Sequence, residues 1–372
     1  YEVSMIKKPI QMVILCLTLL MSPMVFADLT SRIVNGKPTT ITTYPSFVSL
    51  FYDRIEYDRR YSPASFCGGT LLDDRHVLTA AHCLFDGRGS LDIPWLLFTV
   101  ATQVDNESDF PNGNITTVRG EAFFYHPNYD DSVNSLWAND IAIIRLERGL
   151  NGQGFVNRPT SQAYRLGFNG RDDDDNDGIF EAVGHGNTRS GFDEDDRLLF
   201  TTMQYVSNAR CQLDITPFAL ALNPHHLCFK GDGINPDSRL ANGTCQGDSG
   251  GPIYWNNAGH LVQVGITSFG PAECGVGFPQ SQVTSVFTEI YGYRQWIDQV
   301  LNGQLTANYI VTEEARLAFL AGSDNSSVSP APIAADSGSI ASPNASGGGA
   351  IDGLISAVLL LLGYARYQQK RK

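Results

Sequence analysis

The sequence lacks the clustered basic residues with which proteins bind nucleic acids. Its 372 residues include 26 Lys and Arg against 39 Asp and Glu, which gives a formal net charge of −13. Nucleic-acid binding needs basic side chains gathered on one face, so we exclude it as the main function. The acidic balance instead favours solubility in an extracellular medium.

The sequence also has no CxxC pair, although it contains seven cysteines. Zinc sites and thioredoxin-like redox sites commonly use that spacing, so both are disfavoured and we expect no metal. Cys16 lies in an apolar N-terminal segment, and the other six are Cys67, Cys83, Cys211, Cys228, Cys245 and Cys274. An even set predicts three disulfides in an oxidising compartment, and spacing alone leaves fifteen pairings open.

Apolar runs as long as a membrane-spanning helix, about 20 residues, are missing at both ends of the chain. Residues 1–27 are typical of a signal peptide region: Lys7 and Lys8 precede an apolar run over 10–20, and Val25-Phe26-Ala27 offers a cleavage site. The shorter C-terminal run, Leu354 to Leu362, precedes a basic end. We therefore expect an exported protein.

The middle of the chain has the pattern of one large β domain. A hydrophobic content of 42% supports a sizeable core, and 36 glycines suit a protein rich in turns. Short apolar runs alternate with turns over residues 33–303, which predicts strands. Apolar residues at three- and four-residue spacing predict a final helix over 291–301.

Three polar residues stand at positions that suit chemistry. Ser249 lies between glycines in Gly247-Asp248-Ser249-Gly250-Gly251-Pro252, a turn that can expose a nucleophile beside backbone N–H groups. His82 lies next to a cysteine, and Asp140 directly precedes an apolar strand. A buried carboxylate needs a partner, and a histidine is a natural one. Taken singly, each has a plain structural alternative: a surface turn, a solvated histidine, a strand cap.

An acidic run contains Asp173, Asp175, Asp177 and Gly178, which fit the beginning of a calcium loop. The twelfth position would be Gly184, where an EF-hand needs a glutamate. The run is therefore not an EF-hand, and we favour a solvated loop over a structural calcium site.

These motifs occur in one order: Ile33-Val34-Asn35-Gly36, then His82 in TAAHC, Asp140 in NDIA and Ser249 in GDSGGP. Together they make the sequence resemble the chymotrypsin/trypsin family of serine endopeptidases from about residue 33 to 301. The resemblance implies an all-β fold of two six-stranded antiparallel β-barrels with a C-terminal helix. It also implies the disulfides Cys67–Cys83, Cys211–Cys228 and Cys245–Cys274.

The resemblance further implies the roles of the site residues. His82, Asp140 and Ser249 are the expected catalytic triad, with the N–H groups of Gly247 and Ser249 as oxyanion hole. Protein or peptide substrates are expected, and no cofactor is required. The alternative is a binding protein on a protease fold, with little or no activity.

Residues 28–32 are expected to form a short activation propeptide. Cleavage after Arg32 by an activating protease would free the Ile33 ammonium group to pair with Asp248, so we expect a zymogen. By resemblance, Gly243 forms the floor of the primary substrate pocket, and Ser268, Gly270 and Ser285 lie around it. No acid stands at the floor, which favours apolar or aromatic side chains; Glu273 near the rim is the alternative, since it would attract a basic one.

The rest of the chain changes in composition. Residues 304–346 are expected to be a flexible linker, since 322–349 are rich in Ser, Ala, Pro, Asn and Gly. Residues 347–372 resemble the bacterial C-terminal Gly-Gly sorting signal of the rhombosortase type, which a rhomboid-type sorting protease cuts. That resemblance implies the bacterial cell surface, or secretion after processing. A retained membrane anchor and a eukaryotic lipid-anchor signal are the alternatives.

Overall fold

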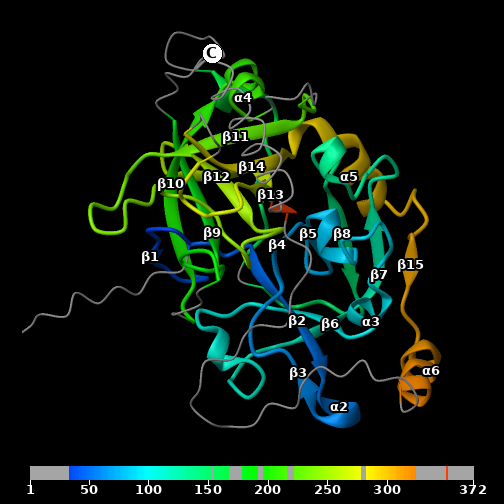
Figure 1. Ribbon diagram of the computed structural model, residues 1–372. Helices are drawn as coiled ribbons and strands as arrows, with labels where there is room; N and C mark the ends of the chain where they lie inside the picture. Colours follow the sequence, from blue (N-terminus) through cyan, green and yellow to red (C-terminus); the bar gives the residue numbers. More distant parts are fainter. Residues whose placement is uncertain are drawn as a thin grey trace, which may run out of the picture. The chain divides into compact units, whose positions relative to one another are not determined.

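The computed structural model describes residues 33–152, 154–166, 178–191, 196–215, 222–277, 282–323 and 349–350. Two closed six-stranded antiparallel β-barrels make up its core, which confirms the predicted fold class. In Figure 1 the first barrel is blue to teal and the second is green to yellow.

The first barrel consists of short strands whose side chains are almost all buried. Around it follow β2 (Phe47–Arg54), β4 (Cys67–Leu71), β5 (His76–Thr79), β8 (Ala142–Leu146), β7 (Val118–Tyr125) and β6 (Thr99–Thr102). Pairing of β6 with β2 closes the ring. The continuous apolar run of β8 follows Asp140 directly, so the carboxylate is carried into the interior at the start of a buried strand.

The second barrel repeats this arrangement. Around it follow β9 (Ile179–Gly184), β10 (Leu199–Val206), β11 (His226–Gly231), β14 (Val283–Glu289), β13 (His260–Gly270) and β12 (Pro252–Asn257). Pairing of β12 with β9 closes it. Along β10 buried and partly exposed residues alternate, as expected where one face of a strand meets the core. Phe180, Phe229 and Phe287 fill the centre.

Shorter elements join or border these strands. They are β1 (Lys37–Pro38), α2 (Ile55–Asp58), β3 (Arg60–Tyr61), η1 (Ala81–Leu84), α3 (Ile93–Leu96), η2 (Glu107–Asp109), η3 (Val133–Ser135), η4 (Ala163–Arg165), α4 (Asn208–Ile215) and β16 (Gly349–Ala350). The backbone of β16 pairs in parallel with Phe269 and Gly270 of β13.

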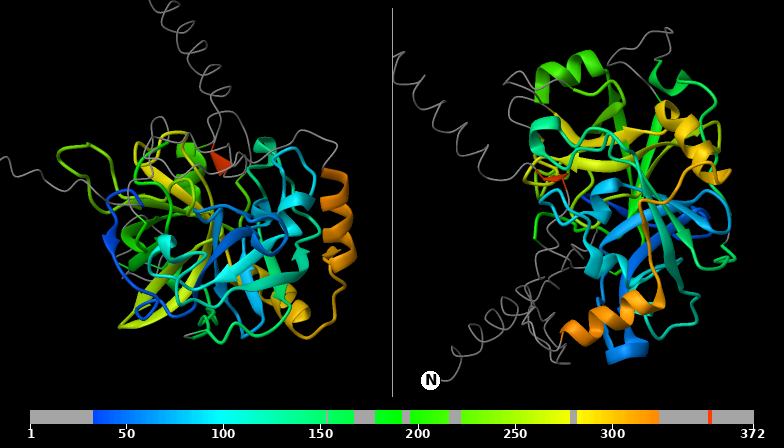
Figure 2. Two further views of the ribbon diagram at one scale, coloured as in Figure 1. Left: turned by 90° about the horizontal axis from the view of Figure 1, so that it is seen from below. Right: turned by 90° about the vertical axis from the view of Figure 1, so that its right-hand side faces the viewer.

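The predicted C-terminal helix is confirmed, with a 3-10 turn before it. η5 spans Tyr291–Tyr293 and α5 spans Arg294–Leu301. Trp296, Ile297 and Val300 are buried in the same cluster as the core of the first barrel. The chain therefore returns from the last strand of the second barrel to cover the first (Figure 2).

The chain beyond this helix differs from the expected linker. β15 (Tyr309–Ile310) pairs with Phe123 and Ala122 of β7, and α6 (Glu313–Ser323) follows. Within α6, Arg316 is buried and donates to Leu97 O at 2.8 Å and Glu147 Oε1 at 2.8 Å. These contacts order 309–323 on the first barrel, because an apolar and charged segment finds partners there that a Ser/Gly-rich one would not.

An aromatic stack fastens α6 to the barrel. Arg54 ends β2, and its guanidinium lies 5.1 Å from the ring of Phe98 and 5.6 Å from the ring of Phe319. The cation thus contacts one ring from the barrel and one ring from α6. The Tyr57 hydroxyl of α2 donates to Glu313 at 2.8 Å. The helix α6 thus also covers the short helix α2.

Within the described ranges, no helix combines the length and apolar character that crossing a membrane requires. The expected signal peptide, the acidic run with Asp173, Asp175 and Asp177, and the apolar run near the C-terminus all lie outside the described residues.

Candidate active site

Asp140 and His82 form a buried pair inside the first barrel. His82 lies on η1, just after β5, and is 3% exposed; Asp140 is fully buried. Asp140 Oδ2 lies 2.7 Å from His82 Nδ1, and Oδ1 accepts the His82 main-chain N–H at 2.9 Å. The Ser268 hydroxyl donates to Asp140 Oδ2 at 2.6 Å. Because an ionised carboxylate can only accept a hydrogen bond, His82 carries its proton on Nδ1. The other ring nitrogen, Nε2, is then free of a proton and can act as the base.

The electrostatics of this pair follow from its burial. Burial alone would lower the pKa of His82, but the charge of Asp140 and its hydrogen bond outweigh burial, so the pKa is raised above its ordinary value. Burial alone would raise the pKa of Asp140, but the His82 charge and the hydrogen bonds from His82 and Ser268 lower it. Asp140 therefore stays ionised and favours a protonated His82 after proton transfer.

Ser249 lies on a turn of the second barrel that contacts the first barrel next to His82. The Ser249 carbonyl accepts from Gly68 N at 2.7 Å, and Gly250 N donates to Thr267 O at 2.9 Å. Gly250 has φ 74°, and a Cβ there would lie 2.2 Å from Thr79 Oγ1 and 3.1 Å from Cys83 Sγ. Only glycine permits this approach. The turn thus docks against the strand end and the cysteine beside His82.

The Asp248 carboxylate faces away from Ser249 into the second barrel. It is 1% exposed and accepts from Gly186 N at 2.8 Å and from Cys245 N at 2.8 Å. A Cβ on Gly186 would lie 2.4 Å from Asp248 Cγ, so this position needs glycine. Asp248 therefore ties the serine turn to two backbone segments.

Ile33 lies against the same segment. Its side chain is fully buried, and its N–H donates to Gly186 O at 3.0 Å. The backbone of Gly186 thus contacts both Ile33 and Asp248, the two residues expected to form the activation pair. Ile33 has φ 53°, a left-handed conformation that is strained for a β-branched residue. Arg32 lies outside the described residues.

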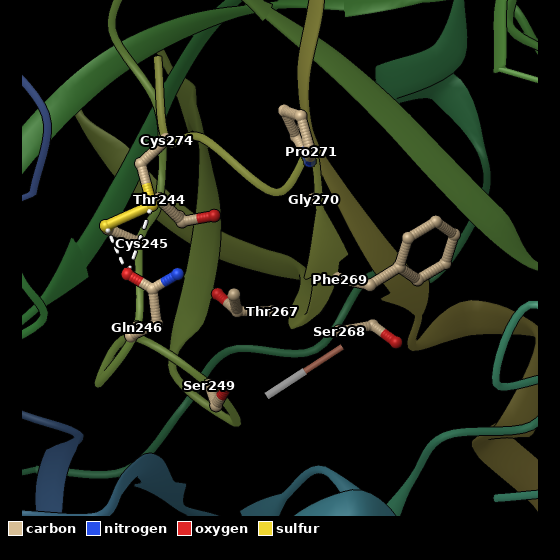
Figure 3. Close-up of a pocket in the computed structure, with 10 residues that line it drawn as sticks. All are labelled: Thr244, Cys245, Gln246, Ser249, Thr267, Ser268, Phe269, Gly270, Pro271 and Cys274. Atoms are coloured by element: carbon tan, nitrogen blue, oxygen red, sulfur yellow. Dashed lines mark hydrogen bonds between the residues drawn. A yellow bond between two sulfur atoms is a disulfide. The ribbon is translucent and has the colours of Figure 1, made fainter. Parts of the chain in front are cut away.

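A pocket opens beside Ser249 (Figure 3). It is lined by Thr244, Cys245, Gln246, Ser249, Thr267, Ser268, Phe269, Gly270, Pro271 and Cys274. None of these ten side chains is charged. The expected residues Ser268 and Gly270 are in the wall. The wall also contains residues that sequence reasoning missed; Thr244 and Thr267 carry no motif that marks them.

Gly243 and Ser285, the expected floor and wall, are both buried and are not among the ten residues that line this pocket. Ser285 is fully buried, and its Oγ accepts from Thr244 N at 2.9 Å. A Cβ on Gly243 would lie 3.1 Å from Thr284 Cβ. Ser285 thus supports Thr244, which lines the pocket.

One lining residue, Phe269, belongs to an aromatic pair that the sequence did not reveal. The rings of Trp137 and Phe269 lie 5.5 Å apart. Trp137 stands three residues before Asp140, and Phe269 directly follows Ser268. Behind them, His226 is 1% exposed and faces Phe269 edge-on at 5.4 Å. Burial lowers the pKa of His226 to about 4, so this imidazole is neutral near pH 7.

Three disulfides join the cysteines in the expected pairing: Cys67–Cys83, Cys211–Cys228 and Cys245–Cys274. The first lies beside His82, and the third borders the pocket. Among the described residues, one group of potential metal ligands lies close enough together to hold an ion: Cys67, His82 and Cys83. Because both sulfurs are in a disulfide and His82 Nδ1 is bonded to Asp140, the donor set does not suit a metal.

Comparison with known proteins agrees with this geometry. The family model described as Trypsin matches residues 33–297. The alkaline trypsin C of Manduca sexta is 32% identical over 72% of this chain and 90% of its own length. The CLIP domain-containing serine protease B4 of Anopheles gambiae is 28% identical over 74% of this chain and 72% of its own. The phenoloxidase-activating enzyme of Bombyx mori is 26% identical over 73% of this chain and 60% of its own.

Proposed function

Because the chain belongs to the trypsin family of serine endopeptidases, we propose that it is an exported enzyme that cuts peptide bonds with His82, Asp140 and Ser249. The observation that carries the proposal is the buried Asp140–His82 pair, together with the Ser249 turn, which packs through Gly250 on Thr79 and Cys83 beside His82. Members of this family generally need no cofactor, and protein or peptide substrates follow from the reaction.

In the proposed mechanism, Ser249 Oγ attacks the peptide carbonyl while His82 Nε2 takes its proton. Asp140 holds the imidazole and stabilises its charged form. The N–H groups of Gly247 and Ser249 stabilise the oxyanion, and each such donor contributes about 10²–10³ in turnover. His82 then passes the proton to the leaving amine, and water hydrolyses the acyl-enzyme with His82 again as base.

We propose that cleavage after Arg32 activates the enzyme. The freed Ile33 ammonium would lie near Gly186, whose carbonyl accepts from Ile33 N and whose N–H donates to the Asp248 carboxylate. A buried charge needs a partner, so pairing of the ammonium with Asp248 would fix the Ser249 turn.

The uncharged wall of the pocket supports a preference for neutral side chains before the cut bond. If the pocket excludes Arg, the enzyme does not cut itself at Arg32, and another protease is needed. Glu273 stays the alternative source of a preference for basic side chains.

The proposal extends to the ends of the chain. The N-terminal signal region implies export, and the Gly-Gly tail implies release or display at the bacterial cell surface after cutting by a sorting protease. Intact mass of surface-released protein tests this: residues 350–372 are lost if the tail is a sorting signal. Calcium at Asp173, Asp175 and Asp177 stays a minor prediction, tested by calcium-dependent melting.

A decisive experiment is fluorophosphonate labelling of the full chain. The protein is cut at Arg32 with an immobilised Arg-specific cysteine protease, which the probe does not label. We expect labelling of the cut wild type, and none of the Ser249→Ala or His82→Ala variants. If the cut wild type were as unlabelled as the two variants, the alternative would be favoured, a binding protein on a protease fold. A peptide library then measures the pocket preference.

A further inference from the structure

Asp140 stands at the centre of a three-residue turn. The N–H of Ile141 donates to Asn139 O at 2.8 Å, across Asp140. Asn139 has φ 62°, in the left-handed region that asparagine tolerates better than most residues. The direction of the Asp140 side chain therefore depends on how Asn139 is held.

Two hydrogen bonds hold the Asn139 side chain. Its Nδ2 donates to Asn128 O at 2.7 Å, and its Oδ1 accepts from the Tyr293 hydroxyl at 2.9 Å. Tyr293 comes from a distant part of the sequence, the turn before α5. The 3-10 turn η5 thus makes a direct polar contact with the residue before Asp140.

The Tyr293 ring is fixed in place. It is 5% exposed, and the rings of His126 and His225 lie 5.2 Å and 5.1 Å from it, both edge-on. Burial raises its pKa well above the ordinary value for tyrosine, so the hydroxyl stays protonated and donates throughout the working pH range. A rigid ring with a permanent donor is well suited to hold one amide.

We propose that Tyr293 is a positioning residue of the active site, which holds Asn139 and thereby the Asp140 carboxylate in register with His82. This inference rests on the proposed function, because it assigns a role in the same triad. Tyr293 touches no substrate. Its hydroxyl acts through one amide on the carboxylate that orients the base.

The test compares Tyr293→Phe, Asn139→Gly and the double variant in the full chain, cut after Arg32. Phenylalanine keeps the ring packing and removes only the hydroxyl, while glycine keeps the positive φ and removes both side-chain bonds. One neutral hydrogen bond corresponds to about a 3- to 10-fold change. We expect each single variant to lower kcat by about that factor with KM unchanged, and the double variant to fall no further than Asn139→Gly. Tyr291→Phe is the control, since it removes a hydroxyl in the same turn from a ring that packs on the second barrel.

A second readout does not need turnover. The proton on His82 Nδ1, bonded to Asp140, is followed by NMR as pH changes. We expect its titration to move to lower pH in Tyr293→Phe, because a looser Asp140 stabilises the charged imidazole less. An unchanged kcat and titration would overturn the proposal, as would a lower melting temperature with an unchanged titration. If the wild type does not cut peptides, the proposed function fails, and the titration still decides the role of Tyr293.

Discussion

Asp140 accepts two hydrogen bonds from His82, one from the ring at 2.7 Å and one from the main chain at 2.9 Å. The carboxylate thus fixes both the position of the residue and the tautomer of its ring. This double contact decides what happens when the acid is changed.

Asp140→Asn is expected to lower kcat by about 10⁴-fold, because an amide can donate to Nδ1 and so favours the wrong tautomer. The measurement is kcat of the cut enzyme on a peptide substrate. Asp131→Asn is the matched control: Asp131 attracts a charged His82 but bonds to Gly89 and Tyr129. Comparable losses in the two variants would contradict the role given to Asp140.

Activity is expected to fall on the acid side with an apparent pKa above 6.5. Neutral His82 is the base, and Asp140 raises its pKa, so activity grows as pH rises through that raised value. The pH dependence of kcat/KM measures it. In Ser268→Ala, Asp140 loses one hydrogen bond. An acid limb in the wild type below the ordinary histidine range would argue against the pairing.

Gly186→Ala is expected to mature normally at Arg32 and still fail to react with a fluorophosphonate. The added methyl would lie 2.4 Å from Asp248 Cγ and displace the carboxylate that holds the serine turn. Gly322→Ala is the control, since nothing lies within 4 Å of its added methyl. Normal labelling of Gly186→Ala would show that the turn does not depend on this contact.

His226 predicts a loss of stability in mild acid. Its pKa is lowered from 6.5 to about 4 by burial, so the unfolded state binds a proton that the folded state does not. The contribution of His226 to stability is fully present above pH 6.5 and falls by about 3 kcal/mol as pH drops to 4. Urea unfolding across this range measures the slope.

The control for this prediction is His226→Leu, which should have a smaller slope than the wild type between pH 6.5 and 4.5; His126, whose pKa is also lowered by burial, keeps part of the slope. Below that range Glu289 contributes as well, because its pKa is lowered to about 2 and its ionised form stabilises the fold. His260→Gln, at an exposed position, should behave as the wild type. An identical slope in His226→Leu would assign the effect to other groups.

Arg316→Ala is expected to destabilise the protein by about 1–3 kcal/mol, because it leaves a buried Leu97 carbonyl without its donor. Thermal unfolding measures the change. Arg158→Ala removes a pair with Asp298 at the surface and should cost less than about 1 kcal/mol. Equal effects would mean that α6 contributes little to the fold.

The motifs TAAHC, NDIA and GDSGGP made the fold predictable, and the same motifs contain the residues that we propose to react. The pocket wall was harder to predict. Thr267 enters it from β13, and Thr244 enters it from a loop whose backbone is bonded to Ser285, a residue 41 positions away in the sequence. Residues 309–323 were missed because their strand is two residues long and the helix finds its partners, Leu97 and Glu147, far away in the sequence.

The strained backbone at Ile33 has a thermodynamic consequence for the proposed cut. Its φ of 53° describes rotation about the N–Cα bond, next to the peptide bond that joins residues 32 and 33. A β-branched residue in this left-handed conformation costs about 1–3 kcal/mol. Hydrolysis of that link abolishes the clash, since a free amine has no preceding carbonyl to meet the side chain. The uncut chain is therefore strained at this one bond. Hydrolysis relieves the strain, so re-formation of the peptide bond is less favourable.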